Sequence, residues 1–344
     1  MIVPAPRDVW QDVIASDSQA LVFQTPAWVD CICASGGYED ASCLYETRAG
    51  RRLILPMVRR SGVPRWLTTQ ASFFPGWGMG GLLADDPVRR EDVALVFDDL
   101  LRRQVLRTTV RPNPLSAEVW AAARPAGVLS VPRLAHVLDL EGGFATVWSE
   151  RFTGTARTAV RKAGRAEIVV ECDATGRLVP IFHDLLRMSL DRWARQQHEP
   201  LALARLRGRR RDPLVKFRAM ATLLGESCRI WVAWVEGRAA AAILVLQDKN
   251  ASYTRGAMDK QLAGPSRANY LLHQLAIEQA CEAGCRSYHM GESGTSPSLA
   301  QFKTRFGAAP HRYAEYHVER LPLTRADQQL RKLVKRAVRF SDHG

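Results

Sequence analysis

Residues 229–290 constrain the fold most strongly. They begin with three strand-like apolar segments: 229–235, 239–246 and 252–257. Glu236-Gly237 between the first two suits a tight antiparallel turn. Residues 265–283 then predict a helix, with a proline near its first turn and Gly284 just past its end, and 286–290 predict another strand. Three antiparallel strands, a capped helix and a further strand indicate a mixed α/β fold.

Length and composition exclude several classes of protein. The chain has 344 residues, 47% of them apolar and 24% charged, which excludes a disordered or low-complexity chain and allows one large or two medium domains. The longest apolar runs, such as 239–246, are far shorter than the roughly 18 residues that cross a bilayer, and no signal peptide is apparent. Seven cysteines without Cys-x-x-Cys spacing or a nearby His cluster predict reduced thiols and no metal site. We therefore expect a cytoplasmic globular protein.

The remaining elements are predicted from periodicity and capping residues. In the first half we expect helices at 26–34 and 88–106, a hairpin of 41–47 with 52–58, a Gly-rich loop at 75–81 and a strand at 134–140. In the second half we expect helices at 152–164, 176–197, 299–306 and 324–340, and strands at 166–171 and 311–319. The Arg-dense stretch 205–211 is expected to have a flexible backbone, with Gly208 as its pivot.

A motif after the strand at 286–290 resembles a known family. Residues 291–307 read Gly-Glu-Ser-Gly-Thr-Ser-Pro-Ser-Leu-Ala-Gln-Phe-Lys-Thr-Arg-Phe-Gly. A Gly-containing loop that leads into Phe-Lys-x-x-Phe-Gly resembles the Fem family of aminoacyl-tRNA-dependent transferases and the FemAB-like (CelD or BioF2-like) enzymes of the GNAT acyltransferase superfamily. The basic helix at 156–164 and the opening Phe23-Gln24-x-x-x-Trp28 agree with it. The resemblance is good over about 144–320 and loose over 20–140.

The resemblance implies a tandem architecture for this chain. The expected fold class is α/β (mixed), with two GNAT-like halves that each hold a mixed, mostly antiparallel sheet flanked by helices. We expect residues 1–143 to form the N-terminal half and 144–320 the C-terminal half with the Phe-Lys motif. Residues 321–344 are expected to form a basic C-terminal helix.

Acyl transfer to an amine requires a positioned carbonyl, a stabiliser of the oxyanion and a base. The resemblance implies that Lys303 faces the donor and acceptor cleft; the alternative is a surface lysine on an amphipathic helix. Glu292, directly after the strand, and His289, within it, are the candidate bases, with a solvated loop charge and a core histidine as their alternatives. Gly291 and Phe302 are candidate substrate contacts, although the spacing of Phe302 also suits a core anchor.

Other candidate substrate contacts lie on two helices. Trp193 and Arg192 share the helix at 176–197, where an aromatic wall for the acceptor competes with core packing. Residues 261–266 partly match the turn with which GNAT enzymes bind the pyrophosphate of acyl-CoA, but Pro265 removes one backbone donor. Arg267 and Asn269, just after this turn, are candidate contacts for a phosphate of either donor.

The positive charge is confined to the second half. Residues 1–150 hold 15 Arg, no Lys and 17 acids, for a net charge of −2, whereas 151–344 hold 33 Lys or Arg and 18 acids, for +15. This asymmetry favours a polyanionic partner over a general coding bias. The candidate nucleic-acid contacts are Arg157, Arg161, Lys162, Arg165, Arg209, Arg210, Arg211 and Arg305. The tail also has the pattern of an amphipathic helix on an anionic membrane, a reading that we do not favour because its apolar side lacks Trp.

The sequence thus predicts an aminoacyl-tRNA-dependent N-acyltransferase without a bound cofactor. It would form an amide bond on an amine of a small-molecule natural product or a peptidoglycan precursor. The alternative is the same fold with acyl-CoA as donor. A third reading is a non-catalytic RNA- or membrane-binding protein on a decayed fold, against which the intact Phe302-Lys303 pair argues.

Overall fold

The computed structural model describes residues 1–85, 87–294 and 296–337. They form two compact units: Met1–Leu134 with His311–Leu333, and Ala135–Pro310 with the described residues from Val334 onward. The second boundary differs from the expected one near residue 320, because the last strand pairs antiparallel with a strand of the first unit, with Tyr316 opposite Val110. In the described residues no helix is long and apolar enough to cross a membrane.

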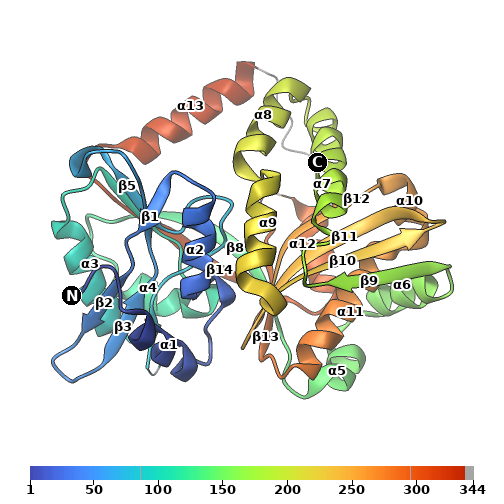
Figure 1. Ribbon diagram of the computed structural model, residues 1–344, viewed down its shortest axis with the longest axis horizontal. Helices are drawn as coiled ribbons and strands as arrows, with labels where there is room; N and C mark the ends of the chain where they lie inside the picture. Colours follow the sequence, from blue (N-terminus) through green and yellow to red (C-terminus); the bar gives the residue numbers. More distant parts are fainter. Residues whose placement is uncertain (86, 295, 338–344) are drawn as a thin grey trace. The chain divides into compact units, whose positions relative to one another are not determined.

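The first unit holds two sheets flanked by helices (Figure 1). Its larger sheet has the strand order β1 (Tyr38–Asp40), β4 (Val58–Arg60), β5 (Thr69–Ser72), β7 (Arg107–Val110), β14 (Ala309–Glu319) and the first residues of β8 (Leu129–Asp139). The smaller sheet is β2 (Cys43–Glu46), β3 (Arg52–Leu55) and β6 (Leu83–Ala84). The helices are α1 (Arg7–Ser16), α2 (Pro26–Ala34), α3 (Arg90–Arg102), α4 (Ala117–Ala123) and, as far as Leu333, the C-terminal α13 (Leu323–Ala337).

Local sequence explains why these elements form. The helix predicted at 26–34 begins where expected, because the Thr25 side chain accepts a hydrogen bond from the amide of Trp28 and Pro26 occupies the first turn. Between α3 and the larger sheet, the rings of Phe97, Trp120 and Tyr316 pack with centroids 5.4–5.7 Å apart and are buried. Burial of this much aromatic surface stabilises the unit.

The second unit is built on one twisted sheet. Its strand order is the last residues of β8, then β13 (Ser287–Glu292), β12 (Ala251–Met258), β11 (Arg238–Gln247), β10 (Cys228–Val235) and β9 (Ile168–Asp173). Its helices are α5 (Gly143–Thr146), α6 (Gly154–Gly164), α7 (Val179–Gln196), α8 (Leu201–Arg211), α9 (Leu214–Leu224), α10 (Lys260–Ser266), α11 (Ala268–Glu282) and α12 (Pro297–Arg305). The three predicted antiparallel strands are β10 to β12, so that expectation is confirmed.

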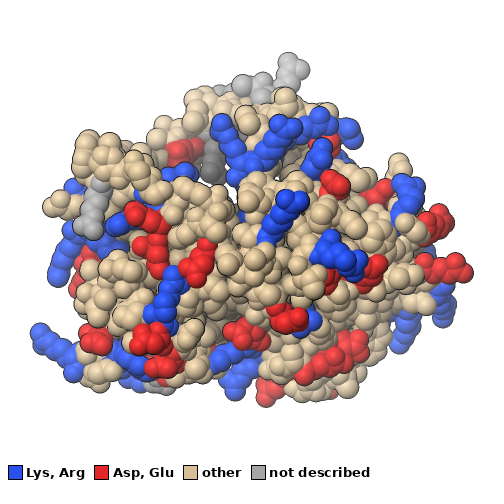
Figure 2. Space-filling view, viewed as in Figure 1, with Lys and Arg blue, Asp and Glu red and all other residues tan. Residues whose placement is uncertain are grey.

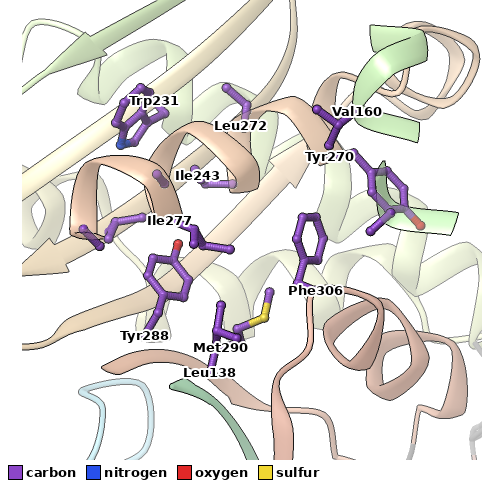
Figure 3. Packing of buried hydrophobic residues seen from close by; sticks show 14 of the residues in the cluster. Leu138, Val160, Trp231, Ile243, Tyr270, Leu272, Ile277, Tyr288, Met290 and Phe306 are labelled. Carbon is purple, nitrogen blue, oxygen red and sulfur yellow. The ribbon is translucent and has the colours of Figure 1, made fainter. Parts of the chain in front are cut away.

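A large apolar core lies between this sheet and α11. Figure 3 shows Ile277 of α11 beside Tyr288 of β13, and the same cluster includes Leu272 of α11, Met290 of β13 and Phe306, which follows α12. All five of these side chains are fully buried. Phe306 therefore anchors the end of this short helix in the core.

Two sequence expectations in this unit are wrong. Residues 205–211 are not a flexible stretch but belong to α8, where Gly208 is buried and a Cβ there would meet Leu190 Cδ1 at 2.9 Å. The single helix expected at 265–283 is two helices. Arg267 interrupts it with a left-handed φ of 60°. The expected pyrophosphate turn at 261–266 is thus itself part of α10.

Candidate functional site

Lys303 lies at the centre of the candidate site. Its helix, α12, starts at Pro297 because the Ser296 side chain accepts from the amide of Leu299. In the last turn of α12 the Lys303 side chain is only 1% exposed. Its Nζ donates to the carbonyl oxygens of Gly291 at 2.9 Å and Glu292 at 2.7 Å. The alternative of a surface lysine is therefore wrong.

The end of β13 explains these two carbonyls. β13 runs parallel to β12, but the two strands pair only at Ala251–Tyr288 and Ser252–His289, although both continue. Beyond that point β13 has an irregular register against β8, and Gly291 adopts φ 71°, which favours glycine. Because buried carbonyls need donors, Lys303 supplies them where the β12 ladder stops.

Burial sets the charge of the Lys303 ammonium. It lowers the pKa of Lys303 to about 8, and the nearby Glu292 carboxylate opposes that shift. The ammonium has three N–H donors, and its hydrogen bonds to described residues use two. The site therefore holds a largely charged lysine at neutral pH with one further donor.

A cluster of rings from α11, α12 and β12 lies near enough to Lys303 for its charge to act on His273. The buried His273 of α11 packs edge-on against Phe302 of α12, with ring centroids 5.2 Å apart, and against Tyr253 of β12 at 4.7 Å. Burial, with the Lys303 charge second, lowers the pKa of His273 to about 3, so its ring is neutral. Phe302 is partly buried against the core, as the anchor interpretation expected.

A histidine–serine pair that sequence reasoning missed lies beside the site. His136 of β8 is opposite Gly291, and its Nδ1 is 3.0 Å from the Oγ of Ser293, with both side chains buried. This contact holds Ser293, the residue after Glu292, against β8, although His136 is 157 positions away in the sequence. Ser293 lies inside the recognised motif, but no sequence signal joins it to His136.

The two candidate bases occupy different environments. His289 is buried and lies opposite Val137 in the register of β13 with β8, as a core histidine would. Glu292 is the half-buried last residue of β13, with its carbonyl on Lys303. Their catalytic roles remain predictions, and Glu292 has the better placement for a proton acceptor.

Arg192 and Trp193 lie on α7 where it crosses the end of β12. Arg192 donates to the carbonyl of Met258 at 2.7 Å, and Ser189 Oγ accepts from the amide of the same residue at 2.9 Å. The Arg192 guanidinium lies 5.7 Å from the centroid of Trp193, whose side chain is 38% exposed. Core packing of Trp193 is therefore wrong, and the exposed ring stays a candidate acceptor contact.

The start of α11 makes a poor pyrophosphate cradle. Arg267 precedes the helix with its left-handed backbone, and Asn269 is half-buried in the first turn. The amide of Ala268 donates to Ser266 Oγ at 3.4 Å and that of Tyr270 to the Arg267 carbonyl at 2.9 Å. Amides that are already bonded locally offer little to an anion.

The expected nucleic-acid contacts separate into two groups. Arg157 donates to the carbonyls of Trp148, Ser149 and Phe152. Arg305 donates to Tyr270 Oη at 2.9 Å. The others are exposed: Arg161 and Lys162 on α6, Arg165 directly after it, and Arg209, Arg210 and Arg211 at the end of α8. In Figure 2, Lys and Arg side chains gather over the region of α8. The first group thus has structural partners. The second group is exposed at the surface, and within it Arg211 forms an ion pair with Asp212 at 3.7 Å.

Comparisons with known proteins agree with this geometry. Residues 150–304 match the family described as acetyltransferase (GNAT) domain. FemX has a TM-score of 0.66 at 10% identity, covering 96% of this chain and 98% of that chain. A conserved protein of unknown function from Bacteroides thetaiotaomicron VPI-5482 gives 0.58 at 9%, covering 92% and 97%, and L-PGS from Bacillus licheniformis gives 0.52 at 12%, covering 94% and 95%. No curated protein matches. The expected mixed α/β fold is confirmed.

Proposed function

We propose that this chain, an acyltransferase with a GNAT domain over residues 150–304, transfers an aminoacyl group from aminoacyl-tRNA to an amine. The product is an amide on a small-molecule natural product or a peptidoglycan precursor. The observation that carries the proposal is the buried ammonium of Lys303, inside the Phe-Lys motif and at the point where β12 and β13 stop pairing.

Each residue of the site has a role in this reaction. The acceptor nitrogen attacks the ester carbonyl, a C–N bond forms, and the C–O bond to the ribose breaks. The remaining N–H of Lys303 donates to the oxyanion of the tetrahedral intermediate, whose charge the buried ammonium stabilises. Glu292 accepts the proton that the amine loses and transfers it to the ribose oxygen, which leaves as a hydroxyl group.

The donor is inferred from charge and backbone. The exposed arginines of α6 and α8 offer phosphate contacts over a surface larger than a coenzyme requires. The first amides of α11 are bonded locally, and Pro265 lacks an N–H where an acyl-CoA enzyme uses donors. The description of the matched family as an acetyltransferase domain supports acyl-CoA as the second candidate donor.

A reconstituted reaction distinguishes the two donors. The mixture contains tRNA charged with radiolabelled amino acids by synthetases and ATP, together with a panel of amine acceptors. We expect labelled amide that disappears after ribonuclease treatment and does not form when acetyl-CoA replaces the tRNA. The Lys303→Met variant is the matched blank for non-enzymatic aminolysis. Amide that survives ribonuclease and forms with acyl-CoA alone would overturn the donor while leaving acyl transfer intact.

A further inference from the structure

The C-terminal helix α13 is anchored to the first unit by its first two turns. The amide of Thr324 donates to Glu319 Oε1 at 3.0 Å, and Asp327 accepts from Arg107 of β7 at 2.9 Å. These two contacts hold the first two turns of α13 and engage Asp327 in an ion pair. Neither contact involves the later turns of the helix.

Apolar side chains further along α13 face solvent. Leu330 and Leu333 are each 62% exposed, three residues apart, and Leu321 before the helix is 56% exposed. Leucines at this spacing lie on one helix face. Together with a further apolar group nearby, leucines exposed in this way would form the kind of apolar patch that marks an interaction site.

A second apolar segment lies close to the start of α13. In the loop between β4 and β5, Trp66 is 63% exposed and Leu67 is 44% exposed. The chain then passes Thr68, whose carbonyl accepts from the amide of Leu106, and the carbonyl of Leu106 accepts from the amide of Arg320. Figure 1 shows the first turn of α13 near β5. The loop therefore supplies the tryptophan that the helix itself lacks.

Basic residues accompany these apolar groups. Residues 320–337 hold six Lys or Arg and one acid, Asp327, which is paired with Arg107. Arg320 and Arg325 are exposed. Positive charge beside exposed leucine and tryptophan is typical of a helix that lies in the headgroup region of an anionic bilayer, where an indole ring is also favoured.

Val63, in the same loop as Trp66, is 41% exposed. We propose that the surface of Val63, Trp66, Leu67, Leu321, Leu330 and Leu333, which we term the apolar–basic surface, binds the face of an anionic phospholipid membrane. Two other occupants fit less well. RNA would take the arginines but leave the leucines in water, and a second copy would bring the same positive charge against itself. The inference is independent of the acyl donor and acceptor, because none of these residues belongs to the candidate site.

The test is co-sedimentation of the purified full chain with vesicles. Vesicles of equal parts phosphatidylglycerol and phosphatidylcholine should bind the chain, pure phosphatidylcholine vesicles should bind it at least about tenfold more weakly, and added salt should weaken the binding. The double variant Leu330→Asp, Leu333→Asp should lose about tenfold or more of the binding. Leu223→Asp, an equally polar change at an exposed leucine of α9, should leave it unchanged.

The fluorescence of Trp66 gives a second test, which does not depend on whether the double Asp variant folds. The difference in fluorescence between the natural chain and Trp66→Phe isolates this indole, and its emission should shift to the blue when anionic vesicles are added. No shift, or vesicle binding that the double Asp variant retains, would overturn the proposal. Two further results would also overturn the proposal if the natural chain does not bind vesicles. The first is a dimer of the natural chain that the double Asp variant does not form. The second is tRNA binding by the natural chain that the double Asp variant loses.

Discussion

Two lysines in the second unit are equally buried but differ in their partners. Within the part of the chain that the structure describes, the hydrogen bonds of Lys303 go to two backbone carbonyls. Lys216 instead donates to the carboxylate of Asp212 at 2.9 Å, which Arg255 also contacts at 3.2 Å. Burial lowers the pKa of both to about 8. Lys303, whose ammonium has a further N–H beyond its two carbonyl bonds, can donate to a reacting group. Lys216, in the cluster with Asp212 and Arg255, has the structural role of holding α9 to β12.

We expect the Met variants of these lysines to separate rate from stability. Lys303→Met should lower kcat by roughly 10²- to 10³-fold, because it removes the donor to the oxyanion. Lys216→Met should change kcat little but lower the free energy of unfolding by about 3 kcal/mol, since it leaves Asp212 buried with less compensating charge. Steady-state kinetics and urea denaturation of both variants measure the two effects. Equal kcat losses would remove Lys303 from the mechanism.

The lowered pKa of Lys303 predicts opposite pH dependences for rate and stability. The rate should fall as pH rises through about 8, because the neutral amine no longer stabilises the oxyanion. Stability should rise between pH 8 and the ordinary lysine pKa of about 10.4, because the unfolded chain then binds more protons than the folded chain. A pH–rate profile of the natural chain tests the first trend. In Lys303→Met, the stability increase in this window should shrink.

At the level of residues, the sequence predicted only what the motif contains. Lys303 was found because it lies in a recognised run of residues. The pairing of Ser293 with His136 and the cluster of Asp212 with Arg255 were not found, since their members are 157 and 43 positions apart. Such pairs depend on strand register, which a single sequence does not specify.

At the level of elements, the final glycine of Phe-Lys-x-x-Phe-Gly ends α12. Gly307 has φ 81°, and a Cβ there would lie 2.5 Å from the Arg151 carbonyl oxygen. Gly284 ends α11 with φ 76° but has nothing within 4 Å of the same position. We expect Gly284→Ala to cost about 1 kcal/mol of stability through backbone strain alone, and Gly307→Ala about 3 kcal/mol or more because the clash adds to it. Thermal unfolding of the two variants isolates the clash, and equal losses would contradict it.

Elements with strong periodicity were predicted, and those with unusual composition were not. Strands β10 to β12 and helix α7 follow directly from apolar patterns. Helix α8 was missed because seven consecutive residues include five arginines, which hid a helix whose Gly208 packs against Leu190. The break at Arg267 was missed because a left-handed arginine has no sequence signature.

At the level of the whole molecule, the charge asymmetry becomes a specific hypothesis once ion pairs are assigned. In α8, Arg205 pairs with Asp191 at 2.7 Å and Arg207 with Glu199 at 2.6 Å. The described residues give Arg209 and Arg210, in the last turn of α8, no ion pair. In α8, the positive charge that is available to a polyanion therefore lies at the last turn of the helix, whereas Arg205 and Arg207 are already paired with carboxylates.

Binding of tRNA at several salt concentrations tests this local charge. The logarithm of the association constant should fall linearly with the logarithm of the salt concentration, by about 0.7 to 0.9 per phosphate contact. Arg209→Ala with Arg210→Ala should flatten the slope by roughly 1.5, because two contacts are lost. Arg205→Ala with Arg207→Ala removes the same net charge and should flatten it less, because those guanidinium groups are already paired. If both double variants give the same slope, binding follows net charge alone, and α8 is not the tRNA contact.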